Sequence, residues 1–140
     1  MPEIRSSSGE KPLVSGYGAV AVAAVELVHG GLAPASAWAQ AALAIFPHSQ
    51  SQQDKGCPRG AFLGLCEAGI VAGVQTGKYS GSVKNKGYAV RAVTLLGADP
   101  SLAESGSKVL WDRVMSGESK APNGQMDVVL ALWRNGLLAA

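Results

Sequence analysis

A cysteine between two cations carries the clearest chemical signal in the sequence. Cys57 lies between Lys55 and Arg59 and is followed directly by Pro58, and proline is favoured at the first position of a helix. Cys57 would then be the N-cap residue, where free backbone N–H groups and the helix dipole favour negative charge. Such a position predicts either a reactive thiolate or a binding site for a phosphate, sulfate or carboxylate group.

Three interpretations of Cys57 stay open from the sequence alone. It could be a small packed residue whose charged neighbours face water, a ligand-binding residue, or a nucleophile. A nucleophile needs a base, and only His29 and His48 are available, neither in a recognisable motif with Cys57. Cys66 falls within an apolar helical pattern and is expected in the core. A helix would hold the two cysteines about 13 Å apart, too far for a disulfide, so we expect free thiols and a reducing compartment.

A second basic segment follows at residues 78–91, where cations alternate with tyrosines and glycines. Its charged and aromatic members are Lys78, Tyr79, Lys84, Lys86, Tyr88 and Arg91. This mixture could hold an acidic partner or a nucleic-acid backbone through charge and stacking. The alternative is a solvated loop that leads into a helix capped by Asn85.

The sequence contains no other recognisable catalytic, metal-binding or phosphate-binding motif. We find no zinc-type spacing, no phosphate-binding glycine loop and no serine-hydrolase elbow. Acidic residues are scattered and do not form a catalytic pair. No cofactor and no metal is therefore expected. The three tryptophans, Trp38, Trp111 and Trp133, occupy core-like positions in helical patterns and are expected to pack rather than to bind a ligand.

The elements that must position these residues are helices. Apolar spacing and the punctuating glycines and prolines predict helices near residues 17–28, 34–46, 58–73, 85–96, 107–115 and 125–137. Alternation typical of strands persists nowhere, so the predicted fold class is all-α, a compact bundle of five or six helices. Gly60 and Gly64 lie one turn apart in the third helix, which predicts that another backbone or a ligand comes close there.

An internal similarity suggests how the helices are grouped. Residues 21–28 align with residues 89–96 without a gap, and each copy is preceded by a tyrosine and followed by a tryptophan-containing helix. Either alanine and valine recur by chance, or the chain contains two related helical hairpins around a central third helix.

Size and composition restrict the remaining possibilities. The 140 residues are 47% hydrophobic and only 16% charged, which predicts one helical domain at residues 15–140 after a flexible lead at residues 1–14. A net charge of +2 argues against a dedicated nucleic-acid binder. No apolar run reaches the roughly 18 residues of a membrane span, so a cytoplasmic protein without a membrane partner is expected. The high apolar content also allows a homo-oligomer.

The stretch at residues 55–67, together with Lys84-Asn85-Lys86 and Tyr88-Ala89, resembles a small bacterial family of uncharacterised helical proteins. The similar region covers roughly residues 17–137. The resemblance implies a helical fold and supplies no activity or catalytic residue, but it points to the same two polar segments.

Together these features predict a helical binding module for a small anionic ligand or a protein partner. The predicted ligand-binding residues are Lys55, Cys57, Arg59, Tyr79, Lys84 and Lys86. A thiol-dependent enzyme that uses Cys57 and a weak nucleic-acid binder that uses residues 78–91 are the alternatives.

Overall fold

The computed structural model describes residues 16–80 and 82–139. Its elements, in chain order, are α1 (Gly16–His29), α2 (Pro34–Ile45), α3 (Gln50–Gln53), α4 (Gly56–Glu67), α5 (Val83–Ala98), the 3-10 helix η1 (Pro100–Glu104), α6 (Ser107–Met115) and α7 (Gln125–Arg134). The all-α class is confirmed: within the described ranges, the extended pairing is a single isolated bridge between Val71 and Leu138. The predicted lead at residues 1–14 lies outside the described residues.

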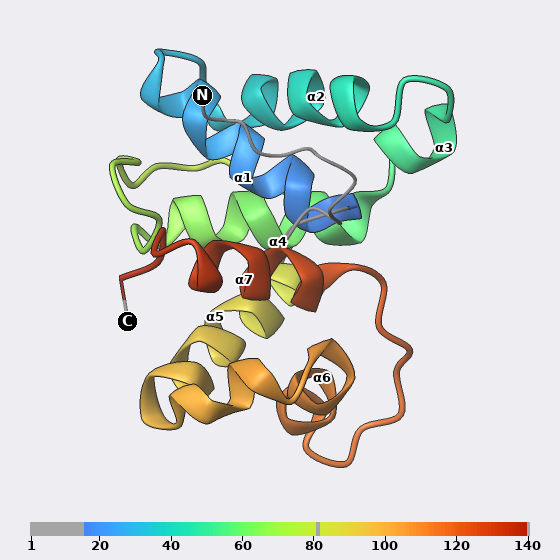
Figure 1. Ribbon diagram of the computed structural model, residues 1–140, viewed down its shortest axis with the longest axis vertical. Coiled ribbons are helices and arrows are strands. Elements are labelled where there is room, and N and C mark those ends of the chain that lie inside the picture. Colours follow the sequence, from blue (N-terminus) through green and yellow to red (C-terminus); the bar gives the residue numbers. More distant parts are fainter. Residues whose placement is uncertain (1–15, 81, 140) are drawn as a thin grey trace, which may run out of the picture.

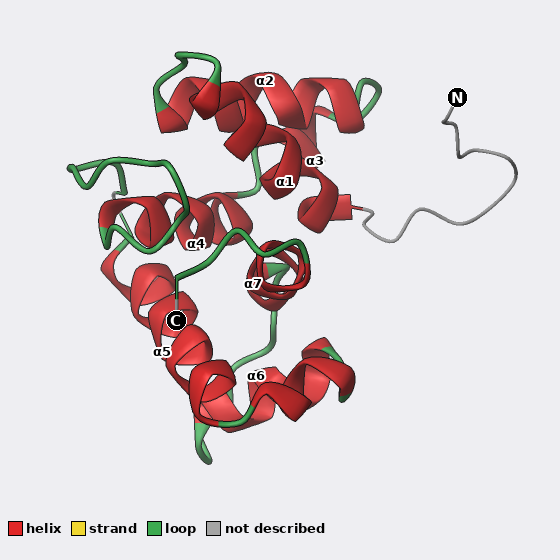
Figure 2. Cartoon of the chain, turned by 60° about the vertical axis from the view of Figure 1, so that its left-hand side comes forward, coloured by secondary structure: helices red, strands yellow, loops and turns green. Residues whose placement is uncertain are grey.

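The helices form three tiers, with α4 and α7 in the middle. In Figure 1, α1 and α2 lie above this pair, and α5, η1 and α6 lie below it. Figure 2 shows α7 end-on, and α7 packs against α1, α4, α5 and α6. Because α7 is surrounded in this way, residues 128–132 are all buried. α7 therefore joins the upper and lower tiers through its apolar side chains.

One continuous hydrophobic cluster runs through all three tiers. Its largest members include Trp38 of α2 and Phe62 of α4, whose ring centroids are 5.2 Å apart. Trp111 is also buried, whereas Trp133 is partly exposed at the edge of the cluster. Two of the three tryptophans thus belong fully to the core.

The structure shifts several predicted helix boundaries. α4 begins at Gly56 with Lys55 as its N-cap, so the prediction that Cys57 caps the helix is wrong. α4 also ends at Glu67 rather than near residue 73, and Gly69 follows with a φ of +78°, which glycine adopts readily. The cap of α5 is Ser82, whose Oγ accepts a hydrogen bond from the backbone N–H of Asn85 at 3.2 Å. Asn85 is therefore the third residue of the helix and not its cap.

The close approach predicted at the two glycines of α4 is present, and α5 is the neighbour. A Cβ atom on Gly64 would lie 2.5 Å from Cβ and 2.6 Å from Cα of Lys86. One on Gly60 would lie 3.1 Å from the Cβ atoms of Ser82 and Asn85. The missing side chains let the first turns of α5 rest directly on the backbone of α4.

The two segments that resemble each other in sequence are connected differently. Residues 30–33 join α1 to α2, whereas residues 99–106, which include η1, join α5 to α6. The position between these helix pairs is shared by α4 and α7. A common origin of the two pairs stays a prediction.

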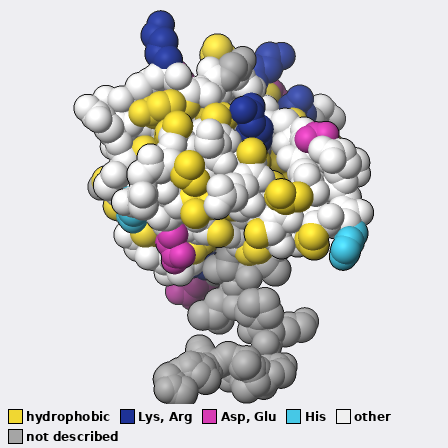
Figure 3. Space-filling model, turned by 90° about the horizontal axis from the view of Figure 1, so that it is seen from above, with side chains coloured by type: hydrophobic (Ala, Val, Ile, Leu, Met, Phe, Trp, Pro, Cys, Tyr) yellow, Lys and Arg dark blue, Asp and Glu magenta, His cyan; other side chains and the backbone are white. Residues whose placement is uncertain are grey.

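The outer face of α2 is uncharged. Residues 27–53 contain no Asp, Glu, Lys or Arg, and Leu43 and Ile45 are 55% and 38% exposed. Figure 3 views the molecule from this end and shows hydrophobic side chains scattered over the face, with Lys and Arg side chains gathered toward its upper edge. None of the described helices is long and apolar enough to cross a membrane.

Candidate functional site

An open groove of about 730 Å³ lies between the beginning of α5 and the loop that precedes it. Its lining residues are Glu67, Lys78, Tyr79, Ser80, Ser82, Val83, Lys86, Gly87 and Val90. Two of the six predicted ligand-binding residues, Tyr79 and Lys86, line this groove. The basic segment selected from the sequence therefore forms one side of a real concavity.

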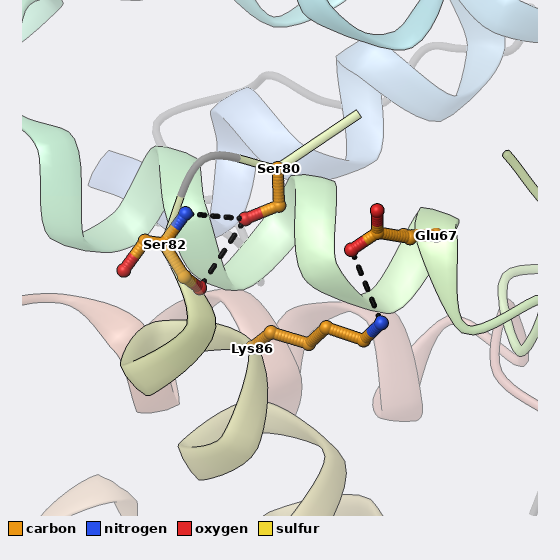
Figure 4. Close-up of polar contacts among 4 residues, drawn as sticks. All are labelled: Glu67, Ser80, Ser82 and Lys86. Carbon is orange, nitrogen blue, oxygen red and sulfur yellow. Dashed lines mark hydrogen bonds and ion pairs between the residues drawn. The ribbon is translucent and has the colours of Figure 1, made fainter. Parts of the chain in front are cut away.

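An ion pair marks the inner end of the groove. The Nζ atom of Lys86 donates a hydrogen bond to Oε1 of Glu67 at 3.1 Å (Figure 4), and the two side chains are 36% and 17% exposed. The geometry follows from Gly64, because the close contact at Gly64 places Lys86 against α4 and Glu67 lies one turn further along that helix. Lys86 is thus a partnered cation rather than an isolated one.

Sequence reasoning missed Glu67 as the partner of Lys86. Its spacing of three residues from Gly64 would place it on the contact face of the helix. The sequence does not reveal which residue of another helix lies opposite. With Lys78 added, the groove holds two lysines and one carboxylate, which leaves one net positive charge.

Serine hydroxyls fix the loop wall of the groove to α5. Ser80 Oγ accepts a hydrogen bond from the backbone N–H of Ser82 at 3.0 Å and donates to the carbonyl oxygen of Ser82 at 3.3 Å (Figure 4). Ser82 Oγ in turn accepts from Nδ2 of Asn85 at 2.8 Å. These short-range bonds connect the end of the loop to the first turn of α5.

The remaining wall is apolar. The hydroxyl of Tyr79 donates to the carbonyl oxygen of Gln75 at 2.8 Å, and its ring lies over Gly77. Val83 is 85% exposed at the first position of α5, and Val90 lines the groove two turns further on. A ligand here would meet both hydrocarbon and ammonium groups, since Val83, Lys86 and Val90 lie on one face of α5 and Lys78 and Tyr79 are neighbours in the loop.

A buried amide supports the groove from behind. Gln125 of α7 is fully buried. Its Nε2 donates to Oδ1 of Asn85 at 3.1 Å, and its Oε1 accepts from the backbone N–H of Asn123 at 2.6 Å. This arrangement connects the first turn of α5 to α7. Nothing in the sequence around Gln125 distinguishes it from an ordinary polar residue at a helix start.

The structure does not bring the other predicted residues into the groove. Lys55 and Arg59 are exposed near the beginning of α4, Cys57 is half-buried between them, and Lys84 is exposed on α5. None of these four residues lines the groove. Of the six predicted residues, two therefore line the groove, three lie near the beginning of α4, and Lys84 is exposed on α5.

The two cysteines differ in their surroundings. Both are free thiols. Cys66 is fully buried, as predicted, and burial raises the pKa of its thiol to about 12. Of the two histidines considered as bases, His29 is engaged elsewhere, because its Nε2 lies 2.7 Å from the carbonyl oxygen of Ala72. Within the described residues, no cluster of three or more His, Cys, Asp or Glu could hold a metal ion.

This difference predicts selective alkylation. We expect N-ethylmaleimide to modify one thiol per folded chain, at Cys57, because the thiolate is the reactive form and Cys66 is both inaccessible and protonated at neutral pH. Mass spectrometry of the digested protein measures the site. The Cys57→Ser variant should stay unlabelled until denaturant is added, and rapid labelling of Cys66 in the folded variant would contradict the expected burial.

Comparison with known proteins gives one match. The model of a family of unknown function (DUF6979) matches residues 14–139. No curated protein and no solved structure matches the chain. Because the matched region covers almost the whole chain and includes every helix described above, the chain belongs to this family of unknown function, DUF6979.

Proposed function

We propose that the chain is a binding module whose groove beside α5 holds a small organic anion with an apolar body. The observation that carries this proposal is that two lysines and an exposed valine line the same concavity. Ligand sites commonly combine an apolar lining with a few well-placed polar groups.

The charge of the groove favours an anion over a cation. Lys78 and Lys86 together outweigh the single carboxylate of Glu67. The ammonium group of Lys86 can donate three hydrogen bonds, and Glu67 accepts one of them. A ligand carboxylate or phosphate would accept another, while Glu67 would keep the lysine oriented toward the groove.

The apolar body of the ligand is inferred from Val83. Its exposure at 85% leaves hydrocarbon in contact with water next to the lysines. Covering it together with Val90 would contribute about 25 cal/mol for each Å² of apolar surface removed from water. A ligand that combines an anionic head with a hydrocarbon or aromatic body could contact both the lysines and the apolar side chains of the groove.

Titration with benzoate and phenyl phosphate tests this proposal. We expect saturable binding by isothermal calorimetry and at least tenfold weaker binding by Lys86→Met, which keeps the side-chain stem but removes the charge. The matched control is Lys84→Met, because Lys84 is exposed on the same helix but does not line the groove. Equal affinities of the Lys86→Met variant and the unmodified protein would refute the proposed site.

A second variant tests the sign of the charge effect. In Glu67→Gln, the groove loses its only carboxylate while the side chain keeps its shape. We expect this variant to bind the same anions several-fold more tightly, because the competing negative charge is gone. Weaker binding by Glu67→Gln would contradict the charge argument.

A further inference from the structure

A second hollow, separate from the groove, lies where the beginnings of α1 and α6 and the end of α2 meet one face of α7. Its volume is about 360 Å³. The residues that give it chemical character are Tyr17, Phe46, Gln52, Ser107, Asp127 and Arg134. None of them lines the groove beside α5, so any ligand of this hollow would bind independently.

Two opposite charges stand on one side of this hollow. Asp127 and Arg134 are seven residues apart on α7, which places them two turns apart on the same face, about 10.5 Å along the helix axis. Among the described residues the ion pairs are Lys86 with Glu67 and Lys108 with Asp112. Asp127 and Arg134 therefore both line the hollow without pairing with each other.

The space between these charges is apolar. Leu130 and Ala131 line the hollow between Asp127 and Arg134 and are nearly buried. Opposite them, Tyr17 and Phe46 form an aromatic pair with ring centroids 5.1 Å apart. Along α7, the wall of the hollow therefore consists of an acidic residue, an apolar strip and a basic residue, in that order.

Hydrogen bonds hold two of the side chains that line the hollow. The guanidinium of Arg134 donates a hydrogen bond to the carbonyl oxygen of Ala103 in η1. The hydroxyl of Tyr17 donates to the carbonyl oxygen of Gln52 at 3.0 Å and so fixes the aromatic wall. Asp127 is exposed to a ligand, and although partial burial raises the pKa of its carboxyl group, an ammonium group bound beside it would favour the charged form.

From this arrangement we propose that the hollow binds a zwitterion whose ammonium and carboxylate groups are separated by an apolar spacer. The ammonium lies at Asp127, the spacer covers Leu130 and Ala131, and the carboxylate lies at Arg134. Because Asp127 and Arg134 are two turns apart on α7, the ligand must place several methylene groups between its two charges. The chemical class is an ω-amino acid.

A series of ligands of increasing length tests the spacing. The probes are glycine, γ-aminobutyrate and ε-aminocaproate, with caproate and hexylamine as analogues that carry one charge each. We follow binding by NMR at the amides of Leu130 and Ala131, and we follow Gly87 as a reporter of the groove. We expect ε-aminocaproate to bind at least tenfold more tightly than glycine and than either singly charged analogue.

Charge-removing variants test the two ends separately. Asp127→Asn should weaken ε-aminocaproate and hexylamine but not caproate, and Arg134→Met should weaken ε-aminocaproate and caproate but not hexylamine. The matched controls are Glu118→Gln and Arg113→Met, exposed residues outside the hollow that should leave binding unchanged. Circular dichroism verifies that each variant is folded.

Three results would overturn the proposal. They are the absence of saturable shifts at Leu130 and Ala131, equal affinity for caproate and ε-aminocaproate at those amides, and unchanged binding by Asp127→Asn. Lys86→Met should leave this binding intact, because Lys86 lies in the groove. Failure of the groove proposal would therefore be visible separately from failure of this one.

Discussion

The Gly64→Ala variant is expected to lose about 2 kcal/mol of its free energy of unfolding, although alanine is the better helix former. The added Cβ would lie 2.6 Å from Cα and 2.5 Å from Cβ of Lys86, so the backbone of α5 must move away from α4. Overpacking of this kind commonly costs 1–3 kcal/mol and sometimes more. The gain in helix propensity, about 1 kcal/mol, offsets only part of that cost.

Two other glycines serve as matched controls for Gly64. Gly87 lies within α5, and a Cβ on it would meet nothing within 4 Å. Gly87→Ala should therefore stabilise the fold by about 1 kcal/mol. Gly60→Ala should fall between the two, because its Cβ would meet the side-chain atoms of Ser82 and Asn85 at 3.1 Å. Urea unfolding measures all three variants, and a Gly64→Ala protein as stable as Gly87→Ala would disprove the tight contact.

The same contact should connect stability to the groove. Moving α5 outward at Lys86 would lengthen the 3.1 Å separation of its ammonium group from Glu67. In the Gly64→Ala variant we therefore expect weaker binding of benzoate as well as lower stability. Gly60→Ala should affect the ion pair less, because its contacts lie one turn closer to the beginning of α5.

The sequence predicts the contact at Gly64 but not the partner that makes it. Two glycines one turn apart are costly in a helix unless something approaches closely, and this reasoning holds for any neighbour. The identity of the neighbour depends on how helices far apart in the chain pack, which local patterns do not encode. For that reason the interaction between Lys86 and Glu67 became visible only in the structure.

Helix existence could be predicted from the sequence because it depends on local apolar spacing. The six helices of nine or more residues all lie where that spacing placed them, with ends displaced by a few residues. The displaced beginning of α4 shows the limit of local rules. Pro58 is compatible with any position of the first turn, so the helix could begin at Gly56 and move Cys57 out of the cap.

Only part of the candidate site could be predicted from the sequence. A basic segment with tyrosines reveals charge, and Tyr79 and Lys86 do line the groove. The predicted site also required Lys55, Cys57 and Arg59 to lie beside this segment, and none of the three lines the groove. The hollow beside α7 was missed for the same reason, since its walls come from residues 16–18, near 50, near 106 and 127–134.

Gln125→Leu should lower the free energy of unfolding by about 2 kcal/mol. Leucine has a similar size and is apolar, so the loss arises from the two groups that Gln125 now satisfies: Oδ1 of Asn85 and the backbone N–H of Asn123. A buried donor or acceptor left without a partner costs about 1–3 kcal/mol. Both groups are partly exposed, so water recovers some of that cost and the total stays below the sum of two full penalties.

A double-mutant cycle with Asn85→Ala isolates the bond between the two side chains. If Gln125 acts through Asn85, then Gln125→Leu should cost less in the Asn85→Ala background than in the unmodified protein, since one of the two unsatisfied groups is already gone. Gln40→Leu, an exposed glutamine on the outer face of α2, is the control and should change stability little. Strictly additive losses would mean that the amide pair contributes nothing of its own. In that case the beginning of α5 would be held to α7 by apolar packing alone.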